Sequence, residues 1–455
     1  MRSARLICAA LGAAQFIWSS AGARGAAQHA PRLGLINQDG VPVRSQPSWN
    51  ARILTVLVQQ SQVEVLGSRS GRWHVKFWAI IGGWVPKADV VFRRPWSTSS
   101  TYQPPEIHYQ VHTRPAVAIH ASATVLDHTL VPWNGASPAP HQGGHVVVSA
   151  WRQDGAGRVW YRVSTSWVRG TELRFDVPDP GRATESGTPL WARISGKGMW
   201  MVLGAATTGS ADSVVRAAMA DGITHLYVES AISPLGFHGR DSVGPLIDDA
   251  HRHHIAVIAW VYPYLYDIGS DVALTRAVAR FQTPSGQRFD GIAEDIERNM
   301  SRTTIRDYSQ LVRAYLGDKY LLVGVTYPPQ SLPNFPFDEV SHFCNAMAPM
   351  DYWHQTQTEN GLDYGHMRYG YAYGCRYATD SIARMRREGV AVPIAPIGQT
   401  FDDFGRLAMG TNAPSAEEVR GFLAGVKASG AMGVSFFQWT SATEGEWRAI
   451  HDFRL

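Results

Sequence analysis

The hydrophobic pattern of the chain changes near residue 195. Before this point, short runs of alternating apolar and polar residues are separated by turn residues. After it, apolar runs alternate with helical segments. Alternation with a period of two predicts strands with one buried face, whereas strands that alternate with helices predict a parallel sheet. We therefore expect small β domains followed by one α/β domain over residues 195–455.

Eight apolar runs are expected as strands of the α/β domain, with helices between them. The strands are Met199–Leu203, His225–Glu229, Ala256–Tyr262, Gly291–Glu297, Leu321–Tyr327, His342–Trp353, Val392–Gln399 and Val434–Trp439. The helices are Ala211–Ala220, Pro245–His254, Val272–Phe281, Thr303–Leu316, Ala378–Arg387 and Ala416–Ala428. Eight strands in about 245 residues match a (β/α)8 TIM barrel. A doubly wound sheet would need a glycine-rich turn after its first strand, and residues 203–209 are a poor version of one.

The N-terminal part predicts one or two small all-β domains. Residues 33–92 contain five short strand-like runs, and residues 110–177 repeat their order of Gly-Arg, Trp and Trp-Val. The segments Val43–Ser48 and Gly83–Val85 resemble the bacterial SH3-like module of wall-associated proteins. This resemblance implies a cell-wall ligand for the domain at 33–92 and for a second, diverged SH3-like domain at 110–177. Trp49, in a turn, is the best aromatic candidate to contact such a ligand.

Residues 1–27 have the features of a signal peptide. A charged start is followed by the apolar run Leu6–Trp18 and by the small residues Ala21–Ala23. The run is too short to span a membrane, and no other transmembrane segment is expected. The protein is thus expected to be secreted or periplasmic. In that setting Cys344 and Cys375 could form one disulfide or stay as two buried free thiols.

Composition and charge narrow the classes of partner. The formal net charge of +4 is mild, and no Lys/Arg cluster interleaved with aromatic residues stands out, so nucleic acid is not an expected partner. The histidines of 251–254 lie at a helix end without the spacing of a metal cage, so neither a metal nor a cofactor is expected.

The segment 289–297 carries the main candidate chemistry. It starts apolar and ends in acids, and because strand side chains alternate, Asp295 and Glu297 face one way while Glu294 faces the other. Two adjacent carboxylates repel each other and lower the stability of the fold, so their presence suggests a function in binding or catalysis. The active sites of TIM barrels lie at the C-terminal ends of the strands, where this pair is expected.

Further polar and aromatic residues end the other predicted strands. The substrate-binding candidates are Glu229, Trp260, Tyr262, Asp351, Tyr352, Trp353, Gln399, Gln438 and Trp439. Aromatic rings suit the apolar faces of sugars, and a carboxyl pair suits the cleavage of a glycosidic bond.

The segment Asp290–Glu297 is similar to the fourth-strand Asp-Gly-x-Asp-x-Asp-x-Glu signature of family-18 glycoside hydrolases, the chitinase-like enzymes. Ala293 stands where that signature has its middle Asp. The segments Met350–Trp353 and Phe437–Trp439 loosely resemble the family's aromatic positions. The Asp-x-Glu of this strand also resembles that of family-25 lysozyme-like barrels.

These resemblances imply an exported glycosidase acting on cell-wall peptidoglycan or another extracellular polysaccharide. They imply Glu297 as general acid and Asp295 as its assisting carboxylate. An N-acetyl group of the substrate could act as nucleophile, held by Tyr262 and Tyr352. Otherwise Glu229 or Asp351 would be the second acid. The alternative functions are a non-catalytic carbohydrate-binding barrel and an adaptor that works through its SH3-like domains.

Overall fold

The computed structural model describes residues 32–36, 41–51, 53–57, 62–77, 81–91, 111–126, 141–177, 188–202, 210–233, 235–240, 242–354, 367, 369–401 and 414–455. Their strands and helices belong to two compact units, one with the elements of residues 32–91 and the other with those of residues 111–455. The segment expected to be a signal peptide lies outside the described residues.

The smaller unit is a seven-stranded antiparallel sheet in the order β3-β2-β6-β5-β4-β1-β7. Its strands are β1 (Arg32–Ile36), β2 (Val41–Arg44), β3 (Ile53–Leu57), β4 (Gln62–Arg69), β5 (Arg72–Phe77), β6 (Ile81–Pro86) and β7 (Val90–Val91). Alternation along the strands places valines such as Val41, Val43 and Val75 in one small core. Trp49 is 70% exposed, and the guanidinium of Arg72 lies 4.3 Å from the centre of its ring.

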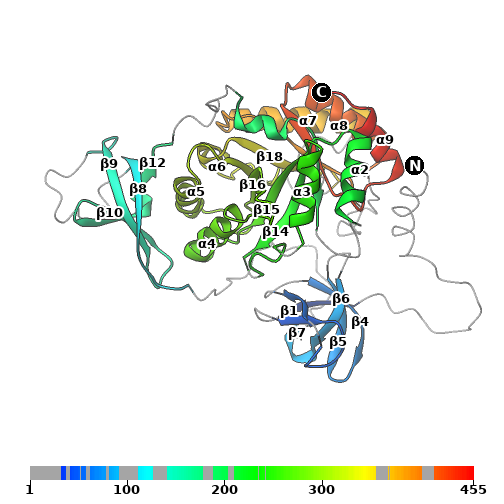
Figure 1. The fold of residues 1–455 in the computed structure, drawn as a ribbon, viewed down its shortest axis with the longest axis horizontal. Coiled ribbons are helices and arrows are strands. Elements are labelled where there is room, and N and C mark those ends of the chain that lie inside the picture. The colour runs from blue at the N-terminus through cyan, green and yellow to red at the C-terminus, as the bar shows by residue number, and fades with distance from the viewer. Residues whose placement is uncertain are drawn as a thin grey trace, which may run out of the picture. The chain divides into compact units, whose positions relative to one another are not determined.

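The larger unit contains a closed barrel of eight parallel strands, β13 to β20, which confirms the expected α/β barrel (Figure 1). The strands are β13 (Gly196–Met201), β14 (His225–Ile232), β15 (Ala256–Tyr262), β16 (Gly291–Asp295), β17 (Leu321–Thr326), β18 (Ala346–Asp351), β19 (Ile397–Gln399) and β20 (Gly433–Phe437). The helices around them are α2 (Ala211–Asp221), α3 (Gly244–Arg252), α4 (Ile268–Ala279), α5 (Arg302–Leu316), α6 (Phe337–Phe343), α7 (Tyr371–Arg387), α8 (Ala416–Ala428) and α9 (Glu444–Asp452).

Local sequence explains where several helices begin and end. Helix α2 begins after Ser210, whose hydroxyl accepts a hydrogen bond from Ser213 N, and ends at Gly222, whose φ of 67° suits glycine. Helix α8 begins with a capping box between Ser415 and Glu418. The short helix α6 was not predicted, and it occupies the first residues of the run 342–353 that was expected to be all strand.

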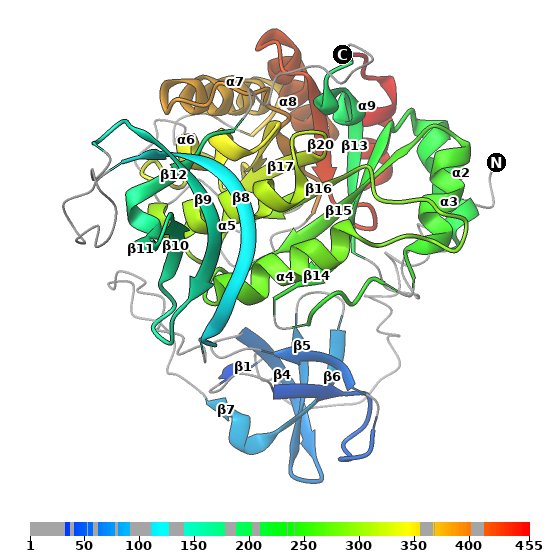
Figure 2. The ribbon, with the colours of Figure 1, turned by 60° about the vertical axis from the view of Figure 1, so that its left-hand side comes forward.

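A second antiparallel sheet, in the order β11-β10-β9-β8-β12, belongs to the same unit as the barrel. Its strands are β8 (Arg114–Val125), β9 (His145–Gln153), β10 (Val159–Val163), β11 (Ser166–Arg169) and β12 (Leu173–Phe175). Figure 2 shows it beside α5. Its inner face joins the core of the barrel helices: Trp151 donates to the hydroxyl of Tyr315 at 2.9 Å, and Tyr161 donates to Asp307 at 3.1 Å.

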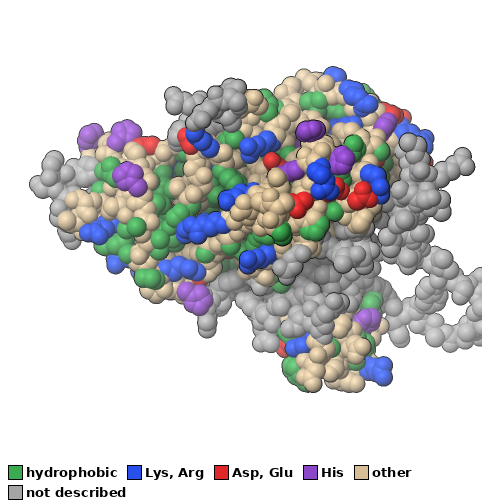
Figure 3. Space-filling view, viewed as in Figure 1, with side chains coloured by type: hydrophobic (Ala, Val, Ile, Leu, Met, Phe, Trp, Pro, Cys, Tyr) green, Lys and Arg blue, Asp and Glu red, His purple; other side chains and the backbone are tan. Residues whose placement is uncertain are grey.

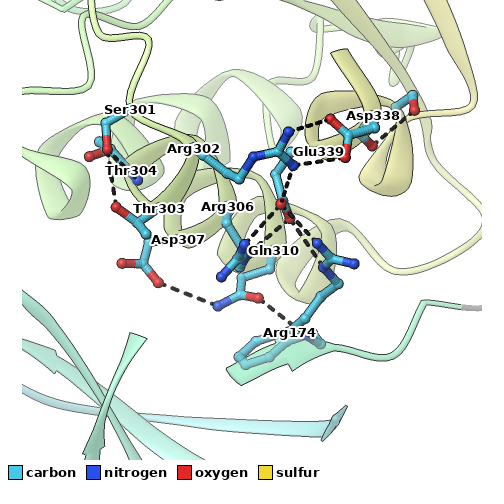
Figure 4. A network of polar contacts seen from close by, with 12 residues as sticks. Arg174, Ser301, Arg302, Thr303, Thr304, Arg306, Asp307, Gln310, Asp338 and Glu339 are labelled. Carbon is cyan, nitrogen blue, oxygen red and sulfur yellow. Dashed lines mark hydrogen bonds and ion pairs between the residues drawn. The ribbon is translucent and has the colours of Figure 1, made fainter. Parts of the chain in front are cut away.

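An ion-pair network around Glu339 ties this sheet to helices α5 and α6 (Figure 4). The carboxylate of Glu339 is fully buried and accepts paired hydrogen bonds from Arg306, both at 2.9 Å. Arg174 of β12 donates to the same carboxylate at 2.9 and 3.2 Å, and Arg302 at 3.2 Å. Because paired guanidinium–carboxylate bonds fix geometry as well as charge, this network holds β12 in place on the barrel.

Two further features of the described residues are the state of the cysteines and the character of the helices. Cys344 and Cys375 are both free thiols; Cys344 is buried, as the second alternative expects, whereas Cys375 is only partly buried. Among the described residues, no helix is both long and apolar enough to cross a membrane.

Candidate active site

The two faces of the barrel wall have different cores, and this decides where each candidate side chain points. Trp200, Tyr227, Ile258, Ala293 and Phe437 belong to a cluster inside the barrel, with Trp260 and Tyr352 packed against it. Their neighbours along the strands belong to the cluster between strands and helices. An interior position at the C-terminal end of a strand is therefore a position at the mouth of the barrel.

Strand β16 brings Asp295 to this mouth. Its neighbour two residues back, Ala293, is interior, so alternation turns Asp295 inward as well. Its exposed fraction is only 3%. The indole of Trp260 on β15 donates its Nε1–H to Oδ2 of Asp295 at 2.9 Å, and Oδ1 accepts no hydrogen bond from the described residues.

Glu297 follows the strand end and receives two tyrosine hydroxyls. Tyr327 donates to its Oε2 at 3.0 Å, and Tyr262 donates to the same oxygen at 3.3 Å. The guanidinium of Arg298 lies 5.0 Å from the ring centre of Tyr264 and 6.0 Å from that of Tyr262. Glu297 is thus held from two neighbouring strands and has a cation nearby.

The carboxyl pair retains protons more strongly than isolated acids do. Burial raises the pKa of Asp295 well above its usual range, and the charge of Glu297 raises it further. Burial also raises the pKa of Glu297, against the hydrogen bond from Tyr327 and the charge of Arg298. Two acids that share one buried site release their protons less readily than isolated acids, and general acid catalysis needs a carboxyl group that still carries its proton.

Aromatic rings surround the pair from several strands. Trp260 makes edge contacts with Trp200 and Phe437, at centroid distances of 5.3 and 5.8 Å. Tyr352 lies in the interior beside Phe401 and Phe437, at centroid distances of 5.0 and 6.0 Å. Burial raises the pKa of Tyr352, and the charge of Asp295 raises it further. The structure therefore brings Trp260, Tyr262 and Tyr352 together with the carboxyl pair.

Glu294 points away from the pair, as the alternation predicts. It is fully buried beside Tyr308 and Arg313 of α5, and burial raises its pKa to about 8. Burial thus favours the protonated form of Glu294 behind the strand.

Glu229 lies in register with Trp260 on the neighbouring strand, next to a bulge in β14. Its carboxylate is paired with His238 at 2.9 Å. Any role for Glu229 at the site therefore includes His238 as its partner.

Three expected site residues face the helices instead of the interior, which corrects their expected position. Asp351 accepts a hydrogen bond from Ser381 of α7 at 2.6 Å, and Trp353 donates to Glu418 of α8 at 2.9 Å. Trp439 packs on Trp447 of α9 at a centroid distance of 5.1 Å. For Asp351 and Trp353 the physical reason is alternation, because Tyr352 between them is interior. Trp439 lies beyond the last residue of β20, Phe437, where strand alternation no longer fixes the direction of a side chain.

The two glutamine candidates differ in what holds them. Gln399 is fully buried, and its amide accepts from His354 N at 3.0 Å and donates to Phe401 O at 3.1 Å. Both ends of the Gln399 amide are therefore occupied in holding the backbone of His354 and Phe401. Gln438 is partly exposed, and its backbone carbonyl accepts from Ser441 Oγ at 3.2 Å. Within the described part of the chain, no group of three or more metal-ligating side chains is present.

Comparisons with known proteins identify no family by sequence. No family model matches the chain, and no curated protein matches it. Similar solved structures include the spore cortex-lytic enzyme SleL of Bacillus cereus, at 10% identity and a TM-score of 0.42, covering 58% of this chain and 75% of that one. A class V chitinase from Pseudomonas fluorescens has 12% identity and a TM-score of 0.42, covering 56% and 98%. A family-18 N-acetylglucosaminidase from Paenibacillus barengoltzii has 12% sequence identity and a TM-score of 0.39, and the match covers 56% of this chain and 99% of that one. TM-scores this low carry no argument about the site.

Proposed function

We propose that the protein is a glycoside hydrolase that cleaves a cell-wall or extracellular polysaccharide, with Glu297 as general acid and Asp295 as its assisting carboxyl group. The observation that carries this proposal is the proton-retaining pair at the mouth of the barrel, enclosed by aromatic rings. Glycosidic bond cleavage needs a carboxylic acid that stays protonated near neutral pH, and sugar rings stack on aromatic faces.

In the proposed reaction Glu297 protonates the departing glycosidic oxygen, and the bond between that oxygen and the anomeric carbon breaks. With an N-acetylated sugar, the acetamide oxygen forms the new bond at that carbon, and water later opens the resulting ring. Oδ1 of Asp295 is free to hold the acetamide N–H, while Trp260 orients the other oxygen. Tyr262 and Tyr352 border this position. Asp351 is no longer a second acid in this scheme because it faces α7.

The test compares the purified chain with Glu297→Gln on peptidoglycan and on chitin oligomers. Glu294→Gln is the matched control, since it makes the same change on the other face of the same strand. Loss of a general acid is expected to reduce turnover about 100-fold or more, whereas the control keeps it. Turnover by Glu297→Gln at the wild-type rate would contradict the role of Glu297. Absence of turnover in the wild type would contradict the enzyme proposal for those substrates.

The second candidate is a carbohydrate-binding barrel without catalysis. Ala293 favours it, because this fully buried methyl group lies in the interior where the chitinase-like signature places an Asp. Saturable binding of the oligomers without any cleavage would support this candidate.

A further inference from the structure

The outer face of the second sheet combines arginines and tryptophans in a regular arrangement. In the antiparallel register, Trp160 lies opposite Arg152 on one side and Arg169 on the other. Arg162 lies opposite Trp167. Residues directly opposite in a sheet share a face, so these five side chains lie on one surface, here called the Arg/Trp face.

The other face of the same strands packs against helix α5. Trp151 and Tyr161, which alternate with these residues, are buried and bonded to Tyr315 and Asp307 of α5. The Arg/Trp face is therefore turned away from the barrel helices. Arg152 and Arg162 on it are exposed, and both tryptophans are partly exposed.

The charges of the Arg/Trp face are unbalanced. Arg158, beside it, pairs with Asp154 at 2.7 Å, and the same carboxylate accepts from the indole of Trp160 at 3.0 Å. Arg152, Arg162 and Arg169 form no ion pair with any of the described residues. The guanidinium of Arg152 lies 4.4 Å from the ring centre of Trp167, and that of Arg169 lies 5.9 Å from the ring centre of Trp160. In Figure 3, basic and histidine side chains accompany hydrophobic ones at the end of the unit that this sheet forms, at the left.

We infer that the Arg/Trp face binds an anionic polysaccharide that carries carboxylate groups. Guanidinium forks match carboxylates in geometry, and partly exposed tryptophans offer surfaces for sugar rings. A sheet face with both kinds of group in alternation suits an extended anionic glycan chain. The choice of a polysaccharide over a nucleic acid rests on the proposed function of the barrel.

The binding test uses the full chain carrying Glu297→Gln, so that cleavage does not disturb it. Insoluble peptidoglycan, which bears carboxylates, is compared with uncharged chitin in co-sedimentation at low and high salt. The test variant is R152Q/R162Q/R169Q. The matched control is R216Q/R420Q/R448Q, which removes three exposed arginines from ion pairs on the barrel helices. Soluble oligomer turnover is measured for both variants on the active background.

The inference predicts that peptidoglycan binds more tightly than chitin and that added salt weakens this binding, because salt screens exposed charges. The test variant is expected to lose about tenfold or more in affinity, which corresponds to about 1.4 kcal/mol. The control keeps its affinity. Trp167→Ala is expected to weaken binding at both salt concentrations, since stacking is not screened.

Three results would overturn the inference. They are unchanged binding by the test variant, an equal loss in the control, and displacement of the glycan by single-stranded DNA at lower concentration than by soluble acidic oligosaccharide. If no substrate is cleaved but the test variant alone loses binding, the proposed catalysis fails while the Arg/Trp face stands.

Discussion

Trp260 and Asp295, which lie on neighbouring strands of the barrel, are joined by a hydrogen bond of 2.9 Å from the indole Nε1–H to Oδ2. This bond favours the ionised form of Asp295 and partly offsets the burial that raises its pKa. It also fixes one oxygen of the carboxyl group, while the other accepts no hydrogen bond from the described residues. The carboxyl pair therefore depends on an aromatic neighbour for its orientation as well as for its proton affinity.

Replacing Trp260 with Phe keeps a ring but removes the donor. A lost hydrogen bond to a buried carboxyl group costs about 1–3 kcal/mol, so we expect kcat/KM on a cleaved glycan to fall by about tenfold or more. The thermal unfolding midpoint serves as the control. A variant with normal turnover and a lowered midpoint would show that Trp260 acts only in packing.

Removing the hydroxyl of Tyr327 is expected to change the pH profile. The hydrogen bond from Tyr327 lowers the pKa of Glu297, so Tyr327→Phe should raise that pKa and move the alkaline limb of the kcat profile to higher pH. One unit corresponds to about 1.4 kcal/mol, the usual size of such a bond. Tyr262→Phe is the graded comparison: its longer bond of 3.3 Å predicts a smaller shift. A shift toward acid in either variant would contradict this assignment.

Glu294 gives a prediction for stability that is separate from catalysis. Its pKa is about 8 in the folded protein and rises from an ordinary value of 4.5, so the folded state holds a proton that the unfolded state has lost. The resulting stability is fully present below the unfolded pKa and disappears as the pH rises through about 8. We expect Glu294→Gln to flatten the fall in the free energy of unfolding over this window, by about 1.4 kcal/mol per pH unit at most. Chemical denaturation at several pH values measures the free energy of unfolding of both proteins. Wild-type and variant curves that run parallel with pH would contradict this role of Glu294.

The Glu339 network predicts a stability that depends on pH in the opposite sense. Burial raises the pKa of Glu339, but the hydrogen bonds from Arg306 and the nearby arginine charges more than compensate, so its pKa lies below the ordinary value. Stability from this group is present above the unfolded pKa and is lost as the pH falls through the folded pKa. Breaking a buried ion pair costs about 3–5 kcal/mol, which is the loss expected for Glu339→Gln.

Asp338→Asn is the matched control for Glu339→Gln. Asp338 is the partly exposed partner of Arg302 in the same network, and exposed pairs contribute about 0–1 kcal/mol. Urea denaturation measures both variants. Equal losses in the two would mean that burial of Glu339 does not decide its contribution.

Hydrophobic periodicity was sufficient to predict the barrel and most of its strands, because buried parallel strands and helix stop signals such as Gly222 are local features. It was also sufficient to separate Glu294 from the carboxyl pair. The same alternation, with Tyr352 in the interior, turns Asp351 and Trp353 outward. Alternation also accounts for Tyr327 at the end of the fifth strand, since it lies two residues beyond Val325 of the barrel interior.

Other features depend on contacts between residues distant in the sequence. The pairing of Glu229 with His238 requires a loop to fold back on β14. The bond between Tyr161 and Asp307 joins residues 146 positions apart, so no local pattern reveals that the second sheet belongs with the barrel. The Arg/Trp face likewise cannot be recognised from the sequence, because its arginines and tryptophans come from three strands and are brought together only by the register of those strands.

The network that anchors β12 on the barrel through Glu339 also sets a length scale. A sheet held by buried ion pairs cannot swing on a linker, so the span from its outer face to Glu297 is a fixed dimension of the molecule. A polymer that is bound at one end of that span and cleaved at the other would be shortened by the same length in each step. Products of uniform length from the wild type, and of mixed length from Glu339→Gln, would be its signature.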